Sequence, residues 1–114
     1  MVDVRSPSDV LRSAAALVRS GWCAGAFAKN AGGGHVHPMS AYAVAWDVFG
    51  AVCRAAAGDG NLAEDALRRV DSICGEEPKG CAGLASMSYN DRNGRTSEEV
   101  AYLLERAAIA EGLR

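Results

Sequence analysis

The sequence has few aromatic residues, little lysine and no long apolar run. Aromatic residues make up 6% of its 114 residues, and no apolar stretch reaches the roughly 18 residues that would indicate a membrane span. The segment that begins at Met1 leads into a capped helix rather than an apolar signal sequence. We therefore expect a cytoplasmic protein without a membrane segment, in which the four cysteines remain thiols.

Positive charge is also sparse. The formal net charge is −2, and the basic pair Arg92 and Arg95 has acidic Asp91, Glu98 and Glu99 beside it. Proteins that bind nucleic acid usually carry a basic stripe that neutralises several phosphates. The composition therefore argues against a nucleic-acid partner.

Alanine, by contrast, is abundant and accounts for 22 of the 114 residues. Each buried alanine removes little apolar area from water, so the core gains less per residue than a leucine-rich core. We expect close approach between helices at these small residues to compensate. The length suits a single domain over residues 1–114, because a second core would be too small to be stable.

Four segments carry the start signals and the apolar spacing of helices. The first has Ser6 as N-cap and Pro7 at its first helical position, and Gly21 is a suitable end. The other three are expected to begin at capping residues, two of them within capping boxes with Glu64 and Glu99: Ser40 before a helix over about 41–57, Asn61, and Thr96.

A glycine-rich segment separates the first two helices. Residues 32–34 are all glycine and lie between 26–30 and 35–37, which predicts a short hairpin that packs on the helices through Phe27 and Val36. A short helical turn is expected near 84–87. The predicted fold class is mainly α, a compact four-helix domain with a small β-hairpin inserted between the first and second helices.

The second helix is predicted to be central because its apolar residues cover more than one face. Trp46 on this helix is expected to be buried, and Gly50 inside it predicts close approach of another backbone. Asp47 is the unusual residue. It is either a ligand contact or general base, or it lies at an exposed edge or in an ion pair with Arg54, Arg68 or Arg69.

Several pieces occur in a recognisable order: Gly21-Trp22-Cys23-x-Gly25-Ala26, then Pro38, then Trp46 with Gly50-Ala51, then Asn90-Asp91 followed by Arg95-Thr96. This order resembles a family of small uncharacterised bacterial and phage proteins. Asp47 departs from the pattern, since many relatives carry cysteine there, and Tyr89 stands where they tend to have tryptophan. The resemblance implies a fold and a cluster of residues, without an activity or a paired-thiol site that includes Cys23.

One candidate site is catalytic. Cys23 is a candidate nucleophile if His35 or His37 lowers the pKa of its thiol and Asn90 or Asp91 orients the imidazole. The alternative is that Cys23 is a small buried apolar residue beside Trp22. Asn90 has two interpretations as well, because it would either satisfy the backbone of the Trp-Cys loop or form a polar wall of a pocket.

A second candidate site is a metal centre formed by His35, His37, Cys74 and Cys81. These spacings are atypical of structural zinc, so we expect no metal and no cofactor. The two cysteines would instead form a disulfide in an oxidising compartment or remain thiols.

The sequence favours a small cytoplasmic binding or regulatory module that acts through protein contacts and is of phage or mobile-element origin. The alternative is a small enzyme or pathway accessory protein, with a small-molecule ligand in a pocket of six residues: Trp22, Cys23, His35, His37, Asp47 and Asn90. A third hypothesis is folding that depends on a metal bound by the histidine and cysteine pairs.

Overall fold

The computed structural model describes residues 6–74 and 82–112, which contain five helices and a two-stranded antiparallel sheet. The mainly helical fold with a small antiparallel sheet is confirmed, but the described helices number five rather than four. The elements in chain order are α1 (Pro7–Ser20), β1 (Ala28–Lys29), β2 (Ala45–Trp46), α2 (Val48–Ala55), α3 (Gly60–Ile73), α4 (Leu84–Asn90) and α5 (Ser97–Gly112).

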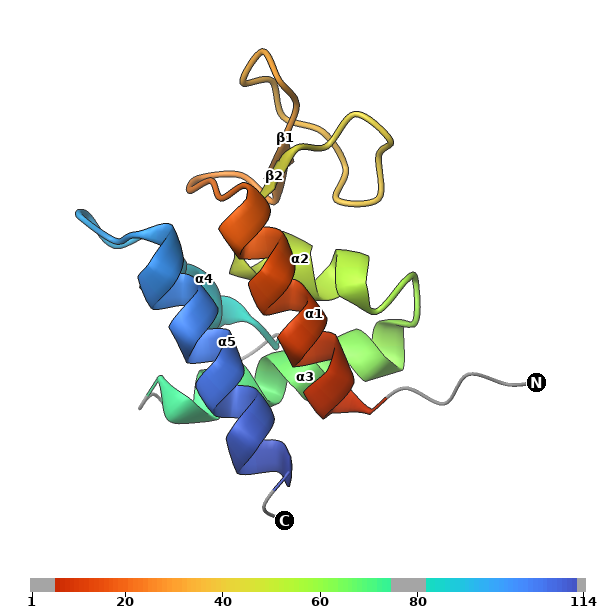
Figure 1. Cartoon of the computed structure of the whole chain (residues 1–114), viewed down its shortest axis with the longest axis vertical. Coiled ribbons are helices and arrows are strands. Elements are labelled where there is room, and N and C mark those ends of the chain that lie inside the picture. Colours follow the sequence, from red (N-terminus) through yellow and green to blue (C-terminus); the bar gives the residue numbers. More distant parts are fainter. Residues whose placement is uncertain (1–5, 75–81, 113–114) are drawn as a thin grey trace.

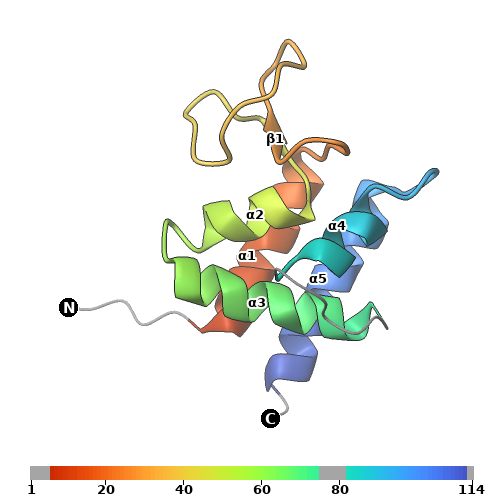
Figure 2. The same ribbon diagram turned by 180° about the vertical axis from the view of Figure 1, so that it is seen from behind.

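The helices form two layers. Figure 1 shows α1 and α5 side by side and running in opposite directions, and Figure 2 shows α2, α3 and α4 on the other side of the molecule. The loop over residues 30–44 extends beyond the helices near the C-terminal end of α1. The core lies between the layers and is rich in alanine and valine, as the composition predicts.

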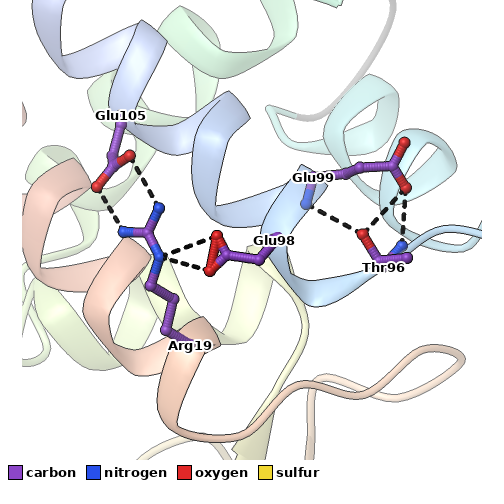
Figure 3. Close-up of polar contacts among 5 residues, drawn as sticks. All are labelled: Arg19, Thr96, Glu98, Glu99 and Glu105. Atoms are coloured by element: carbon purple, nitrogen blue, oxygen red, sulfur yellow. Dashed lines mark hydrogen bonds and ion pairs between the residues drawn. The ribbon is translucent and has the colours of Figure 1, made fainter.

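The pairing of α1 with α5 is held by polar contacts at both ends. Near the start of α1, the Ser8 hydroxyl donates to the Ala108 carbonyl oxygen at 2.9 Å. Near its end, Arg19 lies between Glu98, at 2.9 Å, and Glu105, at 3.0 Å (Figure 3). These contacts fix the antiparallel register, while the buried apolar faces on both helices supply most of the stabilisation.

Capping boxes start the first and last helices. The sequence predicts the Thr96–Glu99 box, whereas at the first helix it predicts Ser6 as the N-cap without the box that Asp9 completes. The Ser6 hydroxyl accepts from the Asp9 N–H, and the Asp9 carboxylate accepts from the Ser6 N–H. Thr96 and Glu99 make the same reciprocal pair at the start of α5 (Figure 3). Both pairs satisfy N–H groups that the first helical turn leaves without an intrahelical partner.

The predicted second helix over 41–57 is too long at its start. The Ser40 hydroxyl accepts from the Tyr42 N–H within a turn, and α2 begins only at Val48. The physical reason is a competing backbone pairing, because Ala45 and Trp46 form β2 with β1. Trp46 is buried as predicted, but it lies on this strand and not on the helix.

Smaller differences occur at the other predicted elements. Asp59, rather than Asn61, caps α3 by accepting from the Leu62 N–H at 3.1 Å. The turn expected near 84–87 is a longer helix, α4. Both helices extend beyond the residues for which the local sequence pattern predicts them. Helix ends are the least sharply defined part of a helix.

The predicted glycine-rich turn is present, but residues 35–37 after it do not form the strand that pairs with β1. The Asn30 side-chain oxygen accepts from the N–H groups of Gly32 and Gly34, and an isolated bridge joins Lys29 to His35. The strand β1 pairs with β2, which lies further along the chain. The hairpin is therefore a β1–β2 pair with a long connection that contains the glycine turn.

Glycine is required where two backbones meet. A Cβ at Gly50 would overlap the carbonyl oxygen of Phe27, so the predicted close approach at this position is confirmed. A Cβ at Gly21 would overlap the carbonyl oxygen of Val44. The two glycines bring the β1–β2 region directly onto α1 and α2. Phe27 adds a ring contact there, since it stacks on Phe49 with centroids 4.7 Å apart.

Candidate functional site

Asn90 is a buried polar residue with all its hydrogen-bonding groups occupied. Its side-chain oxygen accepts from the Trp22 indole N–H at 2.8 Å and from the Val48 N–H at 3.0 Å. Its side-chain N–H₂ donates to the Cys23 carbonyl oxygen at 3.2 Å and to the Asp91 carboxylate at 2.9 Å. Asn90 thus satisfies the backbone of the Trp-Cys loop, which is the structural interpretation of this residue.

Asp71 likewise satisfies backbone N–H groups, here at the start of α4. This role was not predicted from the sequence. Its side chain is 1% exposed, and its two oxygens accept from the Gly83 N–H at 2.8 Å and the Ser86 N–H at 2.9 Å. The Ser86 hydroxyl also donates to it. A residue on α3 therefore caps the N-terminus of α4, because Gly83 has no side chain to do so.

Asp47 is the N-cap of α2 and is almost completely buried. Its side chain is 2% exposed, and its Oδ1 accepts from the Gly50 N–H at 2.6 Å. Asp47 is not at an exposed edge, and no ion pair among the described residues joins it to Arg54, Arg68 or Arg69. Arg54 donates to the Pro38 and Ser40 carbonyl oxygens, and Arg68 pairs with Glu64.

Burial raises the pKa of Asp47 to about 7, and the negative charge of Asp91 adds to this effect. The hydrogen bond from the Gly50 N–H opposes the shift without cancelling it. Desolvation disfavours the charged form of a carboxyl group, and a neighbouring charge of the same sign disfavours it further. Asp47 therefore titrates close to neutral pH.

A cleft of about 330 Å³, which we name the Asp47 cleft, opens beside this carboxyl group. It brings together three of the candidate residues from distant parts of the chain, namely His35, Asp47 and Asp91. The described residues that line it are Gly25, Ala26, Phe27, His35, Asp47, Met87 and Asp91. A carboxyl group with a shifted pKa inside a cleft is a feature of many functional sites.

A second depression, which we name the Phe49 groove, lies next to it and is mostly apolar. Its volume is about 340 Å³, and Phe27 lines both it and the Asp47 cleft. It continues into a hollow of about 400 Å³ along α3, which shares Phe49 and Cys53 with it. The described residues that line the Phe49 groove are Phe27, His37, Pro38, Met39, Phe49, Cys53, Gly58, Asp59, Gly60 and Ala63.

The candidate nucleophile Cys23 lacks the histidine partner that a catalytic thiol would need, among the residues that the structure describes. It is buried, and its thiol approaches the Ala26 carbonyl oxygen at 3.5 Å. Burial raises the pKa of this thiol, and the charge of Asp47 raises it further. In the described part of the chain no hydrogen bond joins Cys23 to His35 or His37. The arrangement favours a protonated, slowly reacting thiol.

The two histidines face different places. His35 lines the Asp47 cleft, whereas His37 lines the Phe49 groove, where its Nδ1 accepts from the Met39 N–H at 3.0 Å. Cys74 is the C-cap of α3. Figure 1 shows α3 at the opposite end of the molecule from the 30–44 loop. Cys81 lies outside the described residues, so the zinc and disulfide hypotheses remain predictions. Within 6–74 and 82–112, no three His, Cys, Asp or Glu side chains form a group suited to a metal.

Comparison with known proteins places the chain in a family. A family model described as a family of unknown function (DUF6197) matches residues 3–110. The chain belongs to this family. This agrees with the resemblance to an uncharacterised family, and membership brings no reaction or ligand with it.

Searches of curated proteins and of solved structures find no match. Among the described residues, no helix has both the length and the apolar character needed to cross a bilayer. The function of this member of DUF6197 must therefore be argued from the Asp47 cleft and the Phe49 groove.

Proposed function

We propose that this member of DUF6197 is a small protein-binding module, and that the Phe49 groove receives an apolar side chain of another protein. The observation that carries the proposal is the groove itself, an apolar hollow of about 340 Å³ with large exposed side chains beside it. Phe27 is 47% exposed and Met39 is 43% exposed. Contiguous apolar surface of this kind on a small protein commonly marks an interaction site.

The walls of the groove are held in place before any partner arrives. The Trp46 indole N–H donates to the Pro38 carbonyl oxygen at 3.1 Å, and Arg54 donates to the same oxygen at 3.0 Å. The Arg54 guanidinium also lies over the Trp46 ring, 5.5 Å from its centroid. A surface fixed in this way loses less conformational entropy when it binds, which favours affinity.

The cellular location, origin and type of partner that we propose are supported by the cysteines, the motif order and the net charge. Cys23 and Cys53 carry thiols that are not in a disulfide, which supports action in the cytoplasm. The order of motifs from Trp22 to Asn90 supports a bacterial or phage origin. A partner protein is favoured over nucleic acid by the net charge of −2.

Selection of peptides from a random display library against the immobilised full chain tests the proposal. We expect enriched peptides that share an apolar residue and whose affinity falls at least tenfold in Met39→Glu. The control is Tyr102→Glu, which changes an exposed apolar residue on α5, away from the groove. Peptides that bind Met39→Glu as well as the wild type, or self-association through the groove seen by sedimentation of the chain alone, would overturn it.

A second candidate function is a small enzyme that uses Asp47 as a general acid or base. The observation that favours it is the shared cleft, in which a carboxyl group with a pKa of about 7 lies with His35. Cys23 would have no nucleophilic role in it. A panel of chromogenic ester and phosphate substrates would support this candidate if turnover by the wild type disappeared in Asp47→Asn and persisted in Asp65→Asn.

A further inference from the structure

The Asp47 cleft is lined by two carboxylates, those of Asp47 and Asp91. Asp47 accepts the Gly50 N–H through Oδ1, and Asp91 accepts the Gly25 N–H at 3.1 Å and the Asn90 amide at 2.9 Å through its own Oδ1. The backbone N–H groups of Phe49 and of Asp47 itself also act on the Asp47 carboxylate. In the described part of the chain no side chain donates to the Oδ2 of either aspartate, so these oxygens can still accept from a ligand. Both carboxylates line the same cleft, and Asp47 is 2% exposed.

No lysine or arginine is among the described residues that line the cleft. The ion pairs among the described residues join Arg19, Arg68 and Arg95 to glutamates, and none includes Asp47 or Asp91. Transfer of a carboxylate from water to a protein interior is costly unless a cation pairs with it, and a second carboxylate nearby adds repulsion. A cationic ligand in the cleft would offset both costs.

We propose that the Asp47 cleft binds the guanidinium group of an arginine side chain. A guanidinium has donors in a planar fork that matches a pair of carboxylate oxygens, and it is less strongly hydrated than an ammonium group. The cleft also offers the Phe27 ring and the Met87 side chain as walls. An aromatic face is a favourable surface for a guanidinium to stack upon.

The protein that supplies this arginine is inferred from the proposed function, as the partner that fills the Phe49 groove. Phe27 lines both the Asp47 cleft and the Phe49 groove, so the two sites are adjacent. One protein segment with an arginine close to an apolar residue would therefore fill both. The partner of this module is then a protein with a basic and apolar segment, which complements an acidic cleft beside an apolar groove.

Affinity for a cation should rise with pH across the neutral range. A proton on Asp47 competes with the guanidinium, and it leaves as the pH passes about 7. The other titratable and charged groups facing Asp47 or the cleft are Asp91, His35, Cys53 and Cys23, with Lys29 acting on Cys23. Burial raises the pKa of both thiols, so they stay neutral here.

The test is titration of the isotope-labelled full chain with N-acetyl-arginine amide, followed by NMR of the backbone amides. We expect a dissociation constant on the order of 1–10 mM and shifts at Gly25, Ala26 and Phe27. Affinity should fall at least tenfold in Asp47→Asn and in Asp91→Asn, and remain unchanged in Asp65→Asn. The spectra also report whether each variant is folded, and Asp91→Asn changes a more exposed residue than Asp47→Asn does.

Two matched probes sharpen the result. N-acetyl-citrulline amide has nearly the same shape without the charge, and N-acetyl-lysine amide has the charge without the planar fork. Binding of the arginine probe alone supports the proposal. No arginine binding, or equal binding of either other probe, overturns it. Because these probes do not occupy the Phe49 groove, failure here is separate from failure of the peptide selection with Met39→Glu.

Discussion

The indole N–H of Trp22 donates to the side-chain oxygen of Asn90 at 2.8 Å, across 68 positions of sequence. The same oxygen accepts the first N–H of α2, from Val48. One amide therefore connects the loop after α1, the start of α2 and the end of α4. Such a residue holds the walls of the Asp47 cleft in place without lining it, because Asn90 is completely buried.

Asn90→Ala is expected to destabilise the fold by about 2–4 kcal/mol, because it leaves several buried partners without hydrogen bonds. The control is Asn93→Ala, which changes an exposed asparagine in the following turn and should cost less than about 0.5 kcal/mol. Urea unfolding of both variants measures the difference. A cost for Asn90→Ala as small as that for Asn93→Ala would show that the bonds to Trp22 and Val48 contribute little.

Two glycines in helices should respond to alanine in opposite directions. Gly50→Ala places a methyl group where the Phe27 carbonyl oxygen lies, and we expect a loss of about 3 kcal/mol or more. Gly60→Ala meets no atom within 4 Å at the start of α3, and the better helix propensity of alanine should add about 0.5–1 kcal/mol. Thermal unfolding of the two variants in parallel gives the comparison, and equal effects would contradict it.

Much of the helical fold follows from local pattern. The N-cap at Ser6, the capping box at Thr96 and the apolar spacing of the first and last helices identify α1 and α5 correctly, because caps and periodicity act over a few residues. The requirement for glycine at position 50 was also predictable, since glycine inside a helix carries a cost that needs a reason.

The second helix shows what local pattern misses. Residues 42–46 have helical spacing, yet Trp46 exchanges backbone hydrogen bonds with the segment after α1, through Gly21 and Cys23. That pairing depends on contacts between distant parts of the chain. It moves the helix start to Val48 and turns Asp47 from a mid-helix residue into an N-cap.

The sequence predicted which residues cluster near the site, but not which of them line the same cleft. His35, Asp47 and Asp91 do meet in one cleft, but Cys23 lies against the Ala26 carbonyl oxygen, and His37 lines the Phe49 groove instead. Periodicity indicates which face of a helix is buried, but it does not give the loop conformation that decides which cleft a side chain lines. The role of Asp71 could not be predicted either, since its partners follow it by 12 to 15 residues and lie at the start of another helix.

Asp71→Ala should destabilise the fold by about 2–4 kcal/mol, since it removes the cap of α4 and leaves buried N–H groups of Gly83 and Ser86 without a partner. Asp65→Ala changes an exposed aspartate on the same helix and serves as the control. Hydrogen exchange followed by NMR should show the greatest loss of protection at Ser86 and along α4. Loss of protection spread evenly over all helices would argue against a capping role.

The stability of the fold should depend on pH through the carboxyl group of Asp47. The pKa of its carboxyl group is about 7 in the folded protein and 3.8 in an exposed aspartate, because burial disfavours the charge. Between these values the folded protein retains a proton that the unfolded chain has released. Unfolding in this range therefore releases a proton, so rising pH favours the unfolded state and stability falls between about pH 4.5 and 7. Above pH 7 both states are ionised, and this contribution becomes constant.

Urea unfolding at several pH values between 5 and 8 measures the effect, which we expect to reach roughly 2–4 kcal/mol. Asp47→Asn carries no titrating group and should remove the fall, whereas Asp59→Asn, at the exposed N-cap of α3, should retain it. Glu99 and Glu105 do not confuse the comparison. The Thr96 N–H lowers the pKa of Glu99 and Arg19 lowers that of Glu105, so both lose their protons below this range. If Asp47→Asn keeps the wild-type slope, another group causes the fall, and Asp47 is ionised throughout in the folded protein.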